Sequence, residues 1–227
     1  MARVYVSAVM DAPIEKIWGV LRDFNALPKW NLGIVDSTIE DGLSADVVGC
    51  VRSFHLGDGA HVRERLLSLD DSRYAFTYNF ETPAFPVDNY VAGMELIPVT
   101  NGDRTFVQWW AHFDEKPEDK DKFVEIVSTN VFAAGLSALA AKVKGTQSPE
   151  GSQRWQGLRP AKVFTSSVIG GPIGDVWAKM RDFAGMDGWH DDITKMHMID
   201  GVRSDKVSGV RDFLFGDGAL WEELTYL

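Results

Sequence analysis

DAPIEKIWGVLRDFNALPKW, residues 11–30, returns later in the chain as GGPIGDVWAKMRDFAGMDGW, residues 170–189. Working outward from this stretch, residues 4–64 align with residues 163–223 without a gap, and 23 of these 61 positions are identical. Self-similarity at a fixed spacing is typical of a repeated structural unit. The chain is therefore expected to contain one unit twice.

The second copy ends early, because nothing in it corresponds to the first copy beyond about residue 68. We expect a complete domain at 1–145, a linker rich in Gly, Ser and Pro at 146–160, and the N-terminal half of a second domain at 161–227. A half-domain exposes an apolar face and a strand edge. We therefore expect a homodimer partner, the first copy or a continuation of the natural chain to cover it.

Composition limits the class of protein. Of 227 residues, 45% are hydrophobic and 25% are charged, which is typical of a soluble globular protein. The net charge of −10, without a Lys/Arg-rich run, argues against nucleic acid and anionic membranes as partners. The single cysteine, Cys50, excludes an intrachain disulfide and fits a cytoplasmic location. We find no signal peptide and expect no membrane span.

Hydrophobic periodicity predicts an α+β domain. A strand at 3–10 precedes a helix at 13–24 and a short segment at 25–30. Six further strands are expected near 33–40, 47–56, 60–69, 73–80, 88–97 and 104–113. Short turns between them predict an antiparallel meander. A strand, a helix and three strands are expected to recur in the second copy.

A long helix is expected at 117–144. Its apolar stripe is predicted to contain Phe123, Ile126, Val127, Val131 and Ala134, widened by Phe132, Leu136, Leu139 and Val143. A sheet and one long helix form two layers around a core. Tyr78 and Tyr90 are predicted to face that helix, and a buried hydroxyl needs a partner. The stripe therefore indicates either a packed core or a partly polar cavity.

The strongest candidate for chemistry is a pair of charges, Arg52 and Glu64. A turn centred on Asp58 places them opposite each other in a hairpin, on the face that also carries Phe54. Such a pair on an apolar face is costly unless both charges are satisfied. It is either a structural salt bridge or a polar anchor or acid/base pair in a ligand cavity. Arg211 repeats Arg52, and its partner is either Glu222 or Glu223.

Other chemical motifs are weak. His55, His61 and His112 are expected to be solvated or structural. His190-Asp191-Asp192 has no counterpart in the first copy, so no metal site is predicted. Gly57-Asp58-Gly59 is a turn and not a phosphate loop, because no helix follows it. We recognise no Ser-His-Asp or Cys-His motif typical of nucleophilic catalysis, and we expect no cofactor.

Three segments together resemble a known superfamily: DAPIEKIWGVLRDFNALPKW, GCVRSFHLGDGAHVRERLLSLDDSRYAFTYNF and NYVAGMELIPV. They are similar to the START-like (SRPBCC) group, specifically to its polyketide cyclase/dehydrase members and, within these, to lachrymatory-factor-synthase-like proteins. The resemblance covers nearly all of the first copy. It implies the helix-grip fold, in which a curved antiparallel sheet wraps around a C-terminal helix and encloses an apolar cavity.

The resemblance also implies a site at Arg52, Glu64 and Tyr90, the catalytic residues that we predict. The chain departs from that group at His61-Val62, where an aromatic residue usually precedes the Glu. We expect further ligand contacts from Trp30, Phe54, Phe76, Tyr78, Met94, Trp109, Phe123 and Val127. The expected function is binding of a small hydrophobic molecule, with polyketide cyclase/dehydrase-like or lyase/isomerase chemistry. The alternatives are a non-catalytic carrier or sensor, and an interaction protein.

Overall fold

The computed structural model describes residues 1–144, 165–204 and 208–224, in two units that divide between Ser167 and Val168. Each unit is described by itself. The predicted linker, 146–160, lies outside the described residues.

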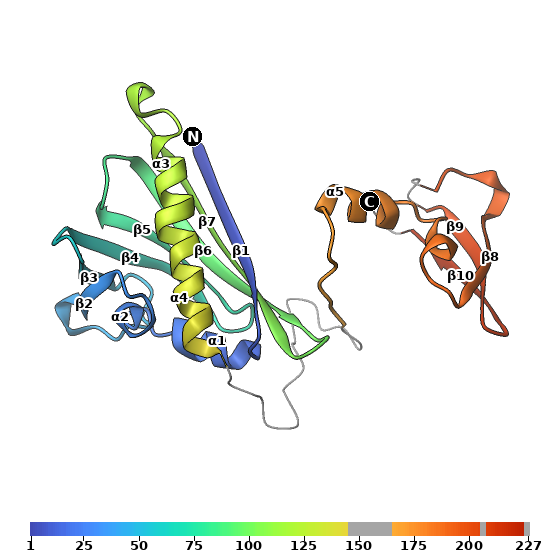
Figure 1. Cartoon of the computed structure of the whole chain (residues 1–227), viewed down its shortest axis with the longest axis horizontal. Coiled ribbons are helices and arrows are strands. Elements are labelled where there is room, and N and C mark those ends of the chain that lie inside the picture. The colour runs from blue at the N-terminus through green and yellow to red at the C-terminus, as the bar shows by residue number, and fades with distance from the viewer. Residues whose placement is uncertain (145–164, 205–207, 225–227) are drawn as a thin grey trace. The chain divides into compact units, whose positions relative to one another are not determined.

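An antiparallel seven-stranded sheet forms the first unit (Figure 1). Its strands are β1 (Ala2–Met10), β2 (Ile34–Ile39), β3 (Val51–Leu56), β4 (His61–Asp70), β5 (Ala75–Thr82), β6 (Asp88–Val99) and β7 (Arg104–Asp114). The order β1-β7-β6-β5-β4-β3-β2 makes β2 to β7 a continuous meander, which confirms the α+β prediction. β3 is shorter than expected, because Gly49 adopts a positive φ of 96° just before it.

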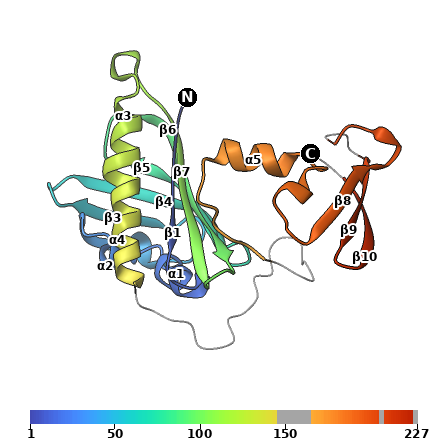
Figure 2. The ribbon, with the colours of Figure 1, turned by 45° about the vertical axis from the view of Figure 1, so that its right-hand side comes forward.

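Helices cover one face of this sheet. A long helix runs across it in both views, with α1 and α2 beside its C-terminal end (Figures 1 and 2). The elements of this layer are α1 (Ile14–Leu21), α2 (Leu27–Trp30) and the consecutive segments α3 (Lys122–Glu125), η3 (Ile126–Ala133) and α4 (Ala134–Val143). Two short turns, η1 (Glu40–Gly42) and η2 (Pro117–Asp119), follow β2 and β7. This is the helix-grip arrangement that the sequence predicts.

The long helix starts at Lys122, later than the predicted residue 117. Asp121 has a positive φ of 62° and interrupts the helical backbone. The Glu115 carboxylate then accepts hydrogen bonds from the backbone N–H groups of Asp121, at 3.0 Å, and Phe123, at 2.7 Å. An acidic side chain that satisfies the free N–H groups of the first turn stabilises a helix start. Glu115, on the preceding segment, therefore sets the boundary.

A π-helical segment, η3, occupies the middle of the long helix. The fully buried positions on the helix are Phe123, Val127, Phe132, Gly135, Leu136, Leu139 and Val143. The step from Val127 to Phe132 is one residue longer than a regular helix allows, because a π turn accommodates an extra residue. The predicted stripe is wrong at Ala134, which is exposed, because the extra residue rotates that position away from the sheet.

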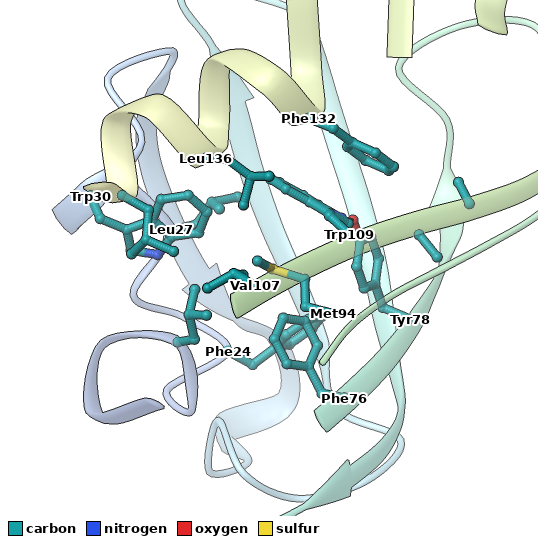
Figure 3. Packing of buried hydrophobic residues seen from close by; sticks show 14 of the residues in the cluster. Phe24, Leu27, Trp30, Phe76, Tyr78, Met94, Val107, Trp109, Phe132 and Leu136 are labelled. Carbon is teal, nitrogen blue, oxygen red and sulfur yellow. The ribbon is translucent and has the colours of Figure 1, made fainter. Parts of the chain in front are cut away.

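Aromatic side chains fill the space between helix and sheet (Figure 3). Trp109 on β7 stacks on Phe132 at a ring distance of 4.4 Å, and it also contacts Trp30 at 6.2 Å. Gly135 permits this packing, because a Cβ at that position would lie 2.7 Å from Trp109 Cζ3. The indole is thus fixed between the helix and the sheet.

By length and composition alone, the segment Lys122–Val143, with a mean hydropathy of 1.5, could cross a membrane. Its buried stripe instead packs on the sheet through residues such as Phe132 and Leu139. The core helix of a water-soluble protein has the same composition. The fold of residues 1–144 is of this water-soluble type.

The second unit contains a small antiparallel sheet of order β10-β9-β8. Its elements are α5 (Ile173–Arg181), η4 (Met186–Gly188), β8 (Ile193–Met198), η5 (Ile199–Gly201), β9 (Val210–Phe215) and β10 (Gly218–Glu223). The strand expected at the start of this copy is absent from its described part, residues 165–169. Ser166, which belongs to the first unit, instead bonds to Thr100 and to the Pro98 carbonyl within that unit.

Apolar side chains of the second unit are exposed. They include Ile173, Trp177, Met180, Trp189 and Trp221. Their positions match buried residues of the first unit where the repeat aligns, for example Trp177 with Trp18, which is 6% exposed. Coverage of this face by a homodimer partner or another segment stays a prediction.

Candidate functional site

Arg52 on β3 and Glu64 on β4 face each other across the hairpin, in the register that the sequence predicts. Arg52 Nε donates to Glu64 Oε2 at 2.7 Å, and Nη2 lies 2.6 Å from the same oxygen. Each residue is only 5% exposed. The pair is therefore a buried, charge-assisted contact on the inner face of the sheet.

Further contacts hold the guanidinium of Arg52 in place. Its Nη1 donates to the backbone carbonyl of Phe24 at 2.9 Å, and its Cζ lies 3.9 Å from the centre of the Phe24 ring. The Tyr78 ring centre lies at 5.3 Å. The segment after α1 thus supplies both an acceptor and a cation–π surface, which restrict how Arg52 moves.

Glu64 differs from an ordinary surface carboxylate. Burial raises its pKa, and the charge and hydrogen bonds of Arg52 act against that increase. Both Arg52 contacts end on Oε2, so in the described part of the chain Oε1 is the oxygen left for a ligand. A carboxylate whose pKa is raised is a stronger base than a surface carboxylate, which suits it to proton transfer.

Tyr78 is hydrogen-bonded to Trp109 and lies beside Tyr90. Trp109 Nε1 donates to the Tyr78 hydroxyl oxygen at 2.9 Å, and Figure 3 shows the two side chains meeting. Burial raises the pKa of both tyrosines. Their ring centres lie 6.4 Å apart. The contact from Trp109 uses an acceptor position of the Tyr78 oxygen, so the O–H of Tyr78 remains available to donate.

A pocket of about 520 Å³ opens beside these residues, within the size range of small-molecule sites. Its polar wall includes Arg52, Glu64, Tyr78, Tyr90 and the indole of Trp109. The apolar wall consists of Leu27, Ile34, Phe54, Leu56, Val62, Phe80, Ala84, Phe85, Phe123, Ile126 and Val131. The lining is completed by Gly33, Gly57, Asn31, Asp58 and Asn130. The last two are exposed, so the pocket reaches the surface.

The three predicted catalytic residues, Arg52, Glu64 and Tyr90, all line this pocket. Of the other predicted ligand contacts, Phe54, Tyr78, Trp109 and Phe123 line it. Trp30, Phe76, Met94 and Val127 do not, because they pack inside the hydrophobic core. Phe76, for example, contacts the Phe24 ring, and Val127 is fully buried.

Several lining residues were not predicted, among them Phe85, Asn130 and Asn31. Phe85 lies in the loop before β6 and stacks on Phe123 at a ring distance of 5.5 Å. Its position between Pro83 and Pro86 is the signal that sequence offers for a restrained loop. Asn130 lies in η3, where the extra residue of the π segment hides it from a regular helical pattern. Asn31 follows α2 and carries no recognisable motif.

The histidines of the hairpin lie outside the pocket lining. His55 and His61 are exposed and stack on each other at 5.0 Å, while His55 Nδ1 lies 2.9 Å from Asp36 Oδ1. Within residues 1–144, 165–204 and 208–224, no group of three or more His, Cys, Asp or Glu side chains is arranged to hold a metal ion.

The second unit contains a counterpart of the Arg–Glu pair. Arg211 lies opposite Glu222 and donates to it through Nε at 2.9 Å, while Nη1 donates to the Phe183 carbonyl at 2.6 Å. Of the two partners predicted for Arg211, the structure has Glu222. Phe215 pairs with Gly218, so only two residues form the turn of this hairpin. The turn is shorter than in the first copy, and the partner of Arg211 is therefore shifted by one residue.

Comparison with known proteins agrees with this geometry. Residues 1–144 match the family model described as polyketide cyclase / dehydrase and lipid transport. The chain belongs to this family. No curated protein matches it.

Several proteins of known structure have the same fold as the first unit of this chain. A protein from Thermobifida fusca is 31% identical with a TM-score of 0.58, and the match covers 63% of this chain and 93% of that one. A Bacillus thuringiensis protein of uncharacterized function is 26% identical with a TM-score of 0.57, over 63% and 98% of the two chains. Norcoclaurine synthase from Thalictrum flavum, 17% identical with a TM-score of 0.54 over 64% and 95%, is similar in fold alone.

Proposed function

We propose that the first unit binds a small, mainly apolar carbonyl compound and catalyses proton transfer on it, in the manner of a polyketide cyclase/dehydrase. The observation that carries this proposal is the buried Arg52–Glu64 pair in the wall of an otherwise apolar pocket. Buried ion pairs of this kind contribute little net stability compared with apolar side chains, so their presence beside a cavity favours a chemical role.

In the proposed reaction, the ligand's carbonyl oxygen lies near the guanidinium of Arg52 and the hydroxyl of Tyr78. Glu64 Oε1 removes a proton from the carbon next to the carbonyl, the electron pair of that C–H bond forms a C=C bond, and the π pair of the carbonyl moves to its oxygen. The fixed positive charge and the O–H donor stabilise the resulting enolate.

In an isomerisation, Glu64 then returns the proton to another carbon of a conjugated enolate. In a ring closure, the enolate carbon attacks a second carbonyl carbon of the ligand, and Glu64 gives the proton to the oxygen of that carbonyl. In a dehydration, Glu64 gives the proton to a β-hydroxyl group, whose C–O bond breaks to release water.

The test is Glu64→Gln, which keeps the size of the side chain and removes its ability to take a proton. Screening aryl ketones and 1,3-diketones for turnover, with binding measured by calorimetry, is expected to show activity falling at least about 100-fold. The ketone affinity is expected to change by less than about fivefold. Wild-type protein that neither binds nor turns over such compounds contradicts the proposal.

A second function, a carrier or sensor that binds without reacting, is favoured by the apolar character of most of the lining. In that case the Arg–Glu pair only anchors the polar end of the ligand. Glu64→Gln would then weaken binding, and no compound that binds would be converted. The same screen therefore separates the two functions.

The hydrogen bond from Trp109 to Tyr78 predicts unequal roles for the two tyrosines. Tyr78→Phe is expected to weaken binding of a ketone ligand about 5- to 10-fold, because it removes the O–H that is free to donate. The Trp109 indole bonds to Tyr78 and not to Tyr90, so the hydroxyl of Tyr90 is less firmly placed and the effect of Tyr90→Phe is expected to stay within about threefold. Calorimetric titration of both variants checks this order. A larger loss for Tyr90→Phe would assign the contact to Tyr90 instead.

A further inference from the structure

The polar groups of the pocket fall into two sets that differ in burial. Arg52, Glu64, Tyr78 and Tyr90 are all nearly inaccessible, at 2–6% exposure. Asn31, Asp58 and Asn130 also line the pocket, but they are half-buried or exposed and so mark its rim. Apolar side chains make up the rest of the lining. The pocket thus has polar groups at its buried end and again at its opening.

The π segment of the long helix gives Asn130 its place at the rim. Val127 and Phe132 both face the core, and the extra residue between them leaves Asn130 and Val131 together in the pocket wall. π segments inside helices occur frequently at functional sites. A regular helix would continue the buried stripe four residues after Val127, at Val131, and would place Asn130 differently. The polar rim position therefore depends on this irregularity.

The other two rim residues are oriented by local hydrogen bonds. Asn31 Oδ1 accepts a hydrogen bond from the Gly33 N–H at 3.1 Å, so the amide nitrogen of Asn31 points away from Gly33. Asn31 Nδ2 lies 3.7 Å from where a Cβ on Gly135 would be, so this amide group lies against the helix. Asp58 Oδ1 accepts from the Ala60 N–H at 3.0 Å in the hairpin turn. Both side chains are thus held by the turns that carry them.

The charge of the rim limits what it binds. Among the lining residues, Arg52 is the only basic one, and it is already paired with Glu64. The rim carries the negative charge of Asp58, which disfavours carboxylate or phosphate groups there. Carboxylate and amide oxygens accept hydrogen bonds, so a hydroxyl group is a matched partner.

From these observations we infer that Asn31, Asp58 and Asn130 form a second polar subsite that binds a hydroxyl group at the far end of the ligand. The substrate class is then an elongated, mainly aromatic carbonyl compound with a hydroxyl group at the end opposite its carbonyl. This inference rests on the proposed function for the position of the carbonyl group at Arg52. Asn130 is its specificity-determining residue.

Two probes that differ by one hydroxyl group test the inference: 2-acetylnaphthalene and 2-acetyl-6-hydroxynaphthalene. Their affinities are measured by calorimetry for the wild type, for Asn130→Leu, and for Thr129→Leu as a control at a neighbouring exposed position outside the lining. We expect the wild type and Thr129→Leu to bind the hydroxylated probe about 5- to 10-fold more tightly, as one or two hydrogen bonds provide.

Asn130→Leu is expected to reduce this preference to less than about twofold while it leaves the affinity for 2-acetylnaphthalene within about twofold. Asn130→Ala provides a second variant, with folding of each checked by circular dichroism. Equal affinities of the wild type for the two probes, or an unchanged preference in both Asn130 variants, overturns the inference and leaves the proposed function in place. Failure of the wild type to bind either probe counts against the proposed function itself.

Discussion

Glu64→Leu is expected to lower the free energy of unfolding by about 3–5 kcal/mol, because it leaves the guanidinium of Arg52 buried without its counter-charge. The side chain of Arg52 is only 6% exposed, so water does not replace the lost partner. Chemical denaturation of the wild type and the variant measures the difference. This is one of the two largest effects that the structure predicts.

A matched control is the ion pair of Arg63 and Glu40. Its two contacts are both 2.6 Å long, so its geometry is as good as that of the buried pair, but its side chains are 32% and 27% exposed. Glu40→Leu is expected to cost only about 1 kcal/mol or less. The double variant Arg52→Met/Glu64→Leu removes both buried charges and is expected to recover most of the loss. Equal losses for the two single variants would show that the buried pair is hydrated.

Phe132→Ala is expected to cost about 3–5 kcal/mol, because it removes a fully buried ring and leaves a cavity beside Trp109. Ala134→Lys, two residues further along, is expected to change stability by no more than about 0.5 kcal/mol, since that position is exposed. Thermal and chemical unfolding of the two variants give the values.

The same pair of variants tests the π segment. A regular helix in the predicted register would bury residue 134, and a lysine there would then cost several kcal/mol because its charge would lie in the core. A large loss for Ala134→Lys together with a small loss for Phe132→Ala would therefore contradict the π segment.

Sequence reasoning succeeded where the determinants are local. The turn at Asp58 and the alternation of a strand fix the pairing of Arg52 with Glu64, and the structure has that register. Strand order also followed from short turns. The tyrosine stripe on β5 and β6 indicated a polar element in the core, and Tyr78 and Tyr90 indeed line the pocket.

It failed where the structure depends on contacts between distant residues. The helix start depends on Glu115, which lies before the helix, and the change of face at Phe132 depends on packing against Trp109. Neither contact can be recognised from the spacing of hydrophobic residues, because a prediction from that spacing takes the helix to be regular throughout. The pocket wall was mistaken at Trp30, Phe76, Met94 and Val127 for a related reason. An apolar residue on the inner face of the sheet either packs in the core or lines a cavity, and the amino-acid sequence does not distinguish the two environments.

Gly135 has a consequence beyond the close approach of a helix to a sheet. Any side chain at this position would displace the Trp109 indole, and the indole is hydrogen-bonded to Tyr78, the donor assigned to the ligand. A single methyl group added at position 135 of the helix would thus move the Trp109 ring and, with it, the Tyr78 hydroxyl in the pocket. Position 135 is a remote steric control over chemistry that it never touches.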